Sequence, residues 1–181
     1  SIMSTIKVDR IEPQDGLQSN AMGGIVQVVR VVHTGQVSSN STTYVSTGLQ
    51  ASITPRSASN KIMVSFEHSI YHNGGPTNTS NVYTIHGIKI LRGTQDIYTP
   101  VSNSNGPYEF GGYDGDGSYF SNNYARPRVE YLDSPATTSP ITYSTKIACF
   151  NNEGIVYVNY FSSVETTVAP QSWMTLTEIT A

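Results

Sequence analysis

The sequence contains a single cysteine and few charged residues. Cys149 is the only cysteine in 181 residues, so no disulfide can form within one chain. Charged side chains make up 13% of the residues, about half of the share that is usual in globular proteins. The exposed faces of helices normally need such side chains, whereas Ser, Thr, Asn and Gly suit strands and turns. We therefore expect a β-rich fold that is held together by packing or by assembly with other copies.

Nucleic acids and membranes are poor partners for this chain. The net charge is −3, and the ten Lys and Arg residues are spread along the sequence, which predicts no basic face for phosphates. No apolar run is long enough to span a bilayer, so we expect no membrane insertion. Motifs of serine hydrolases, P-loop enzymes and zinc proteases do not occur either. We therefore predict a protein that is not an enzyme and that needs no cofactor.

Alternating and β-branched segments predict strands along most of the chain. Residues 24–33 are apolar on both parities, so both faces of this strand should be covered. Residues 43–53 alternate between apolar and polar side chains, either as one strand or as two short strands broken at Gly48. The same alternation recurs at residues 62–70. The first half of the chain is therefore expected to consist of strands joined by short turns.

The second half continues this pattern. A β-rich run at residues 82–92 is interrupted by Gly87, and residues 173–179 predict a closing strand. Residues 141–149 and 155–161 flank a compact turn, which predicts a β-hairpin. Many short strands without any helical period indicate an all-β fold, an antiparallel β-sandwich that is jelly-roll-like.

The predicted sandwich is a single domain of residues 23–181, preceded by a short N-terminal arm or attachment segment at residues 1–22. The arm carries spaced apolar residues before a turn at Pro13, and we expect it to reach onto a neighbouring subunit or a shaft. Between residues 93 and 128 the strand pattern gives way to a loop rich in Gly, Tyr and Asn. Loops of this length are uncommon unless they are functional or contain short strands.

This loop is the best candidate for a binding site. Aromatic rings stack on the C–H faces of sugars, and Asn, Asp and Arg bond to sugar hydroxyls; tyrosine also offers contact area at a low cost in entropy. The alternative is that the aromatic residues pin the loop to the sheet or pack against a neighbouring copy. The candidate ligand-binding residues are Tyr108, Tyr113, Asp114, Asp116, Tyr119, Asn122, Tyr124 and Arg126.

Histidine and acidic residues offer weaker signals for a metal or catalytic site. His68 and His72 share a parity, but we interpret His68 as a hydrogen-bonded core or interface residue and His72 as part of the following turn. The stretch 114–117 resembles a calcium loop that lacks most of its oxygen donors, so we interpret it as a surface turn and predict no metal site. Cys149 fits a small buried apolar residue. No pair of carboxylates is selected by the spacing of Glu109, Asp114, Asp116 and Glu130.

Six segments carry strand and turn signatures: residues 3–9, 24–29, 47–55, 60–64, 91–93 and 133–143. Together they resemble a family of virion structural proteins from marine tailed phages, including cyanophages, which are usually described as tail-fibre-like. The resemblance spans Ser4 to Ala181 and rests on strand and turn signatures. It implies a β-rich domain located in the virion, assembled as a homo-oligomer of three copies and joined to other virion proteins through the arm. It supplies no catalytic residues.

The leading functional expectation is a tail-fibre or appendage module that binds a glycan or receptor on the host surface. The alternative is a capsid decoration or head-fibre protein that makes no contact with a receptor. A polysaccharide depolymerase is less favoured, since tailspike hydrolases are usually longer, repetitive β-helices and no such repeat is present here.

Overall fold

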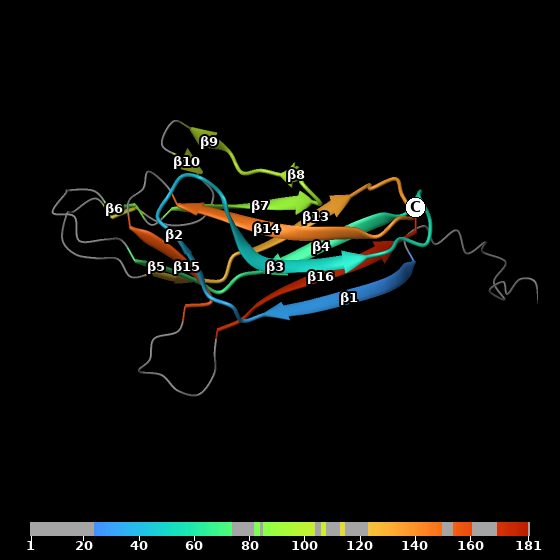
Figure 1. Ribbon diagram of the computed structural model, residues 1–181, viewed down its shortest axis with the longest axis horizontal. Coiled ribbons are helices and arrows are strands. Elements are labelled where there is room, and N and C mark those ends of the chain that lie inside the picture. The colour runs from blue at the N-terminus through green and yellow to red at the C-terminus, as the bar shows by residue number, and fades with distance from the viewer. Residues whose placement is uncertain are drawn as a thin grey trace, which may run out of the picture.

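The computed structural model describes most of the chain from Gly24 onward. The described residues are 24–73, 82–83, 85–103, 106–107, 113–114, 123–149, 154–160 and 170–180. Within these ranges every regular element is a β-strand, and the strands pair antiparallel (Figure 1). The prediction of an all-β, antiparallel sandwich is therefore confirmed. The predicted N-terminal arm, residues 1–22, lies outside the described residues.

Two four-stranded sheets form the layers of the sandwich (Figure 1). Sheet A has the order β1, β16, β4 and β13, whose bounds are Ile25–His33, Ser172–Ile179, Lys61–Glu67 and Arg128–Asp133. Sheet C has the order β3, β14, β7 and β8, whose bounds are Val45–Ile53, Ile141–Cys149, His86–Arg92 and Gln95–Tyr98. The chain passes from one sheet to the other several times, so the core is closed by contacts between residues far apart in sequence.

The first and last described residues meet at one end of the sandwich. The backbone N–H of Thr180 donates to the carbonyl of Gly24 at 3.0 Å, and the N–H of Gly24 donates to Oγ1 of Thr180 at 2.9 Å. Because residues 1–23 precede this point in the chain, we call it the arm end.

A third sheet lies at the opposite end (Figure 1). Sheet B has the order β12, β5, β15 and β2, whose bounds are Asn123–Ala125, Ile70–Asn73, Ile155–Val158 and Val37–Ser39. Strand β5 starts shortly after β4 ends, so one nearly continuous segment crosses from sheet A into sheet B. Two short ladders complete the described part, β6 with β11 and β9 with β10, whose bounds are Val82–Tyr83, Tyr113–Asp114, Ser102–Asn103 and Gly106–Pro107. The predicted loop at 93–128 thus contains short strands.

The core fills the space between sheets A and C. Along β3 every second residue from Thr47 to Ile53 is buried, as the alternation predicted, and β3 runs as one strand through Gly48. Gly48 has a φ of +80°, and a Cβ there would lie 2.6 Å from Nε2 of His33, so only glycine fits this point. The side chains at the centre of the core are Leu49, Ile62, Val64, Phe66, Ile88, Ile90, Tyr143, Ile147, Met174 and Leu176.

Three expectations about local pairing are wrong. Strands β14 and β15 form no hairpin, because both edges of β14 are occupied by β3 and β7; β15 pairs with β2 and β5 instead. Gly87 does not interrupt its strand, since it pairs with Ala148 inside the β7–β14 ladder. His72 lies within β5 and not in a turn. In each case a partner far away in sequence decides the local structure.

Strand β1 is covered on one face only. Val29 and Val31 pack against the core, whereas Val28 and Val32 are 55% and 49% exposed on the outer face of sheet A. The expectation that both faces of residues 24–33 are covered is therefore not met within one copy of the chain.

Glu178 is a fully buried carboxylate in β16 that organises the arm end. Its oxygens accept hydrogen bonds from Nδ2 of Asn60 at 2.6 Å and from the backbone N–H of Arg56 at 2.7 Å. Nε2 of Gln27 in β1 donates a third at 2.5 Å. Burial alone would raise the pKa of this carboxyl, but the hydrogen bonds outweigh burial and the pKa is lowered. The carboxylate thus ties the connection between β3 and β4 to sheet A.

We expect Glu178→Ala to lower the free energy of unfolding by about 2–4 kcal/mol, because it leaves buried donors without an acceptor. Asp96→Ala is the matched control, since it removes an exposed carboxylate that pairs with Lys89 at 2.6 Å. That change should cost less than about 1 kcal/mol. Urea denaturation followed by the fluorescence of Trp173 measures both values. Equal effects of the two substitutions would show that the carboxylate of Glu178 organises nothing.

Candidate ligand-binding site

Four tyrosines gather on sheet B and form what we call the tyrosine cluster: Tyr71, Tyr124, Tyr157 and Tyr160. Tyr71 in β5 is the register partner of Tyr124 in β12 and of Tyr157 in β15, so the three rings stand side by side on one face. The ring centroids of Tyr71 and Tyr124 are 4.7 Å apart, and those of Tyr71 and Tyr160 are 4.5 Å apart and stacked. Strand register therefore brings together aromatic residues from three distant segments.

The members of the cluster differ sharply in exposure. Tyr71 is 8% exposed and forms the floor, whereas Tyr124 is 69% exposed. Burial raises the pKa of Tyr71, and the neighbouring phenols of Tyr124, Tyr160 and Tyr157 raise it further, so its hydroxyl stays neutral. Tyr124 thus presents an open ring that is backed by a buried one.

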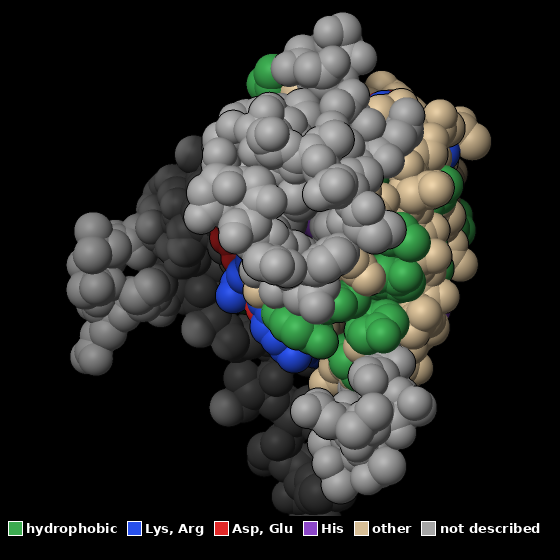
Figure 2. All heavy atoms as spheres, turned by 90° about the vertical axis from the view of Figure 1, so that its left-hand side faces the viewer, with side chains coloured by type: hydrophobic (Ala, Val, Ile, Leu, Met, Phe, Trp, Pro, Cys, Tyr) green, Lys and Arg blue, Asp and Glu red, His purple; other side chains and the backbone are tan. Residues whose placement is uncertain are grey.

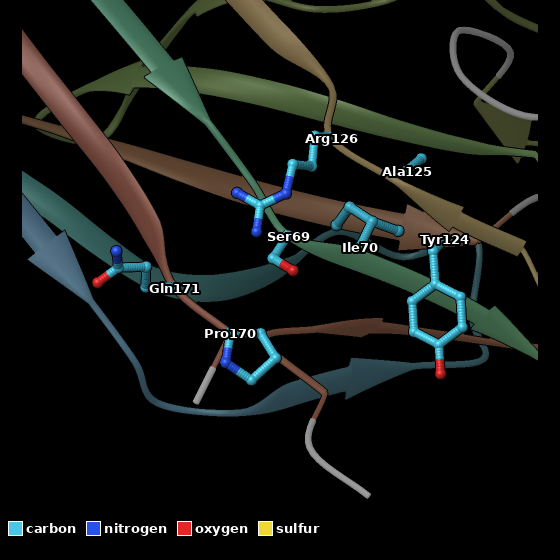
Figure 3. A pocket seen from close by; sticks show the side chains of 7 residues that line it. All are labelled: Ser69, Ile70, Tyr124, Ala125, Arg126, Pro170 and Gln171. Carbon is cyan, nitrogen blue, oxygen red and sulfur yellow. The ribbon is translucent and has the colours of Figure 1, made fainter. Parts of the chain in front are cut away.

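A pocket of about 410 Å³ lies beside the open ring. In Figure 3 the guanidinium of Arg126 and the amide of Gln171 lie on one side of this pocket and the ring of Tyr124 on the other. Arg126 is held by an ion pair with Glu67, whose Oε1 is 3.0 Å from Nη1. Figure 2 faces this end of the molecule and shows hydrophobic side chains next to basic ones between the parts of the surface drawn in grey. The pocket therefore combines a stacking surface with two hydrogen-bond donors, of which Arg126 is held by an ion pair.

A buried polar network holds sheet B against the sandwich. His68, between β4 and β5, places Nδ1 2.9 Å from Oγ of Ser172 in β16 and Nε2 2.9 Å from Oγ1 of Thr145 in β14. Oγ of Ser172 donates to Oδ1 of Asn159 at 2.8 Å. Nδ2 of Asn159 in turn donates to the carbonyls of His33 and Gly35. A single imidazole therefore connects sheets A, B and C.

The network fixes the tautomer of His68. The one hydroxyl proton of Ser172 is directed at Asn159, so Ser172 accepts a hydrogen bond from His68 and Nδ1 must carry the ring proton. Nε2 then accepts from the hydroxyl of Thr145. A neutral imidazole makes both of these hydrogen bonds without placing a charge in the core. Burial, with a smaller contribution from His33, accordingly lowers the pKa of His68 to about 3.

The network also positions the tyrosine cluster. The N–H of Ser69 donates to Oγ of Ser172 at 3.3 Å, and the N–H of Asn159 donates to the carbonyl of Ser69 at 2.8 Å. Asn159 takes a φ of +55°, a conformation that asparagine tolerates better than most residues. Tyr71 lies two residues after Ser69, and Tyr160 lies directly after Asn159. The hydrogen bonds of Ser69 and Asn159 therefore hold the backbone that positions both rings.

Of the eight predicted ligand-binding residues, the structure brings Tyr124 and Arg126 to one pocket. Tyr113 and Asp114 form strand β11, paired with β6, and their side chains are not among those described. The other four predictions, Tyr108, Asp116, Tyr119 and Asn122, lie outside the described residues.

Sequence reasoning missed the other residues of the site. Tyr71 lies 22 positions before the predicted loop at residues 93–128, and Tyr157, Tyr160 and Gln171 lie 29 to 43 positions after it. No local motif marks them. The one available signal was that tyrosines alternate with buried residues in short strands. This signal indicates a cluster only when the strand register is known.

His72 and His86 are buried as well, whereas His33 is partly exposed. His72 has Nε2 3.6 Å from Sγ of Cys149, which is itself fully buried, as predicted for a small apolar residue. His68 is a hydrogen-bonded core residue, in agreement with its interpretation. Among the described residues no group of three or more His, Cys, Asp or Glu side chains is arranged to hold a metal ion. Nor do they include a helix that is long and apolar enough to cross a membrane.

No protein-family model and no curated protein sequence matches this chain.

The buried histidines predict loss of stability in mild acid. In the unfolded chain each imidazole titrates near 6.5, whereas burial lowers the pKa of His68 and His86 to about 3 and that of His72 to about 4. Between these limits the unfolded chain binds more protons, so the free energy of unfolding must fall as the pH falls. We expect this fall between pH 7 and pH 5, where carboxylates contribute little.

Urea denaturation at several pH values measures this dependence. His72→Gln should reduce the slope, because one of the three buried groups no longer titrates. A free energy of unfolding that stays constant from pH 7 to pH 5 would mean that the folded protein protonates these histidines freely.

Proposed function

We propose that this chain is a non-enzymatic structural module of a tailed virus particle whose sheet B end binds a glycan on the host surface. The observation that carries the proposal is the exposed ring of Tyr124, which lies on buried Tyr71 beside a pocket lined by Arg126 and Gln171. The family resemblance supports the assignment to a virion appendage such as a tail fibre.

The chemistry of the pocket supports a sugar as ligand. A pyranose ring presents C–H groups that stack on an aromatic face, and its hydroxyls pair with guanidinium and amide groups. Tyr124 supplies the face, and Arg126 and Gln171 supply the polar groups. The ion pair of Arg126 with Glu67 fixes the guanidinium in advance, which lowers the entropy lost on binding.

The placement of the site supports a role at the outer tip of an appendage. The arm end, where Gly24 meets Thr180, and the tyrosine cluster lie at opposite ends of the sandwich (Figure 1). A module attached to the particle through residues 1–23 would therefore direct the tyrosine cluster away from its attachment point.

The strand order supports a jelly roll. Counted in chain order without sheet B and the two-residue ladders, the eight strands of the two large sheets are arranged 1-8-3-6 in sheet A and 2-7-4-5 in sheet C. This order winds the chain in paired antiparallel strands across both sheets, as in double-sheet jelly rolls of capsid and lectin domains.

A capsid decoration protein without receptor contact is the second candidate. The exposed apolar side chains of Val28, Val32 and Leu132 on sheet A favour assembly whether or not a sugar binds. The two candidates differ in one property, because only the first binds a glycan through Tyr124.

Glycan binding is tested by probing an array of bacterial surface polysaccharides with the purified chain and measuring the affinity of each hit by biolayer interferometry. We expect Tyr124→Ala to weaken binding about tenfold, which corresponds to about 1.4 kcal/mol of lost stacking. Tyr124→Phe retains the ring and should stay within about threefold of the unchanged protein.

Arg126→Ala should weaken the same hits, whereas Arg56→Ala removes an exposed arginine from the opposite end of the sandwich and should leave them unchanged. No hit on the array, or hits that Tyr124→Ala leaves intact, would reject glycan recognition at this site and favour the decoration protein.

A further inference from the structure

Exposed apolar side chains are concentrated on one sheet. Seven large apolar residues of the described chain are exposed, and five of them belong to the two edge strands of sheet A. Those five are Ile25, Val26, Val28, Val32 and Leu132. Single exposed apolar residues are ordinary, but a contiguous group on one face marks a contact surface.

Strand register arranges the outer face of sheet A in rows that run from β1 to β13. One row is apolar at both ends: Val28 pairs with Thr177, which pairs with Met63, which pairs with Leu132. The next row is charged at both ends: Arg30 pairs with Thr175, followed by Ser65 and Glu130. The two ends of this row lie three strand spacings apart, roughly 14 Å.

The charges at the ends of the second row are of opposite sign and cannot meet within one copy. Arg30 forms no ion pair among the described residues; its guanidinium lies over the ring of Trp173, 4.7 Å from the centroid. Glu130 is about half exposed and pairs with Arg128, which lies 5.4 Å from the same centroid. A face of one sign would favour a charged ligand, whereas a face of mixed sign that carries apolar rows fits a second copy of itself.

We propose that the outer face of sheet A is the contact face of a closed homo-oligomer in which the β1 edge of one copy lies beside the β13 edge of the next. In any closed ring whose subunits turn this face toward an axis parallel to the strands, the two opposite edges of neighbouring copies meet at equal height. Arg30 then faces Glu130 of the neighbour, and Val28 faces Leu132 of the neighbour. The same contact between edges therefore pairs the charged ends of one row and the apolar ends of the other.

The closed ring also accounts for the exposed side of β1. Among the described strands it pairs with β16 alone, and an apolar edge of this length invites association. Trp173 lies in a groove of about 350 Å³ between Arg30 and Arg128, and an aromatic residue flanked by arginines is typical of the centre of a protein interface.

The test is the molar mass in solution, measured by size-exclusion chromatography with light scattering at micromolar concentration. We expect a dimer or a trimer for the unchanged chain and a monomer for the double variant Val28→Glu, Val32→Glu. Circular dichroism and urea denaturation confirm that this variant is folded, since both side chains already point to solvent. A monomeric unchanged chain, or an oligomer that the folded double variant leaves intact, would overturn the proposal.

A charge exchange tests the pairing of the two edges. Arg30→Glu and Glu130→Arg should each weaken association about tenfold, and the two combined should restore it to within about threefold. If the combined variant loses as much association affinity as the product of the two single losses, the two edges do not meet. Tyr124→Ala is the control that keeps the oligomer intact, so failure of the contact face and failure of glycan binding are distinguished.

Discussion

The position of sheet B depends on one neutral imidazole. His68 lies where the chain leaves sheet A, and its two nitrogens bond to Ser172 in sheet A and to Thr145 in sheet C. The hydroxyl of Ser172 donates a hydrogen bond to Asn159, which directly follows β15 of sheet B. A protonated imidazole would place a charge in this buried site, where its two partners are the uncharged hydroxyls of Ser172 and Thr145. The geometry of the tyrosine cluster therefore requires His68 to stay neutral.

The low content of charged residues is matched by hydrogen bonding between uncharged polar side chains in the protein interior. Hydroxyl and amide side chains replace charged ones along the sequence, and several are fully buried, among them Thr47, Thr145 and Ser172. A hydroxyl can donate one hydrogen bond and accept others, so a chain of them satisfies itself without the desolvation cost of an ion pair. The low charge noted in the sequence thus reflects buried hydrogen bonding as well as the preference of these residues for strands.

The local pattern of apolar and polar residues predicted most of the strands, but it could not predict which strands pair with one another. Alternation placed β3, β4 and β14 correctly because a half-buried strand repeats every two residues. The prediction of a hairpin between β14 and β15 was wrong. The turn signal between them is local, whereas β3 and β7, which occupy both edges of β14, come from elsewhere in the sequence. The same limit hid the tyrosine cluster. Tyr124 was found within its loop, but Tyr71 and Tyr157 join it only through the register of sheet B.

The contact face and the tyrosine cluster have a joint consequence. A ring axis parallel to the strands of sheet A places all arm ends on one side and all sheet B ends on the other, since the two lie at opposite ends of the sandwich (Figure 1). Each copy then presents Tyr124 and Arg126 in the same direction. If this shallow site binds a sugar as proposed, linked sites would raise the overall affinity by roughly 10²–10⁴ for a ligand that repeats. A repetitive surface polysaccharide would meet that condition, so assembly through sheet A would strengthen the binding that one small pocket provides.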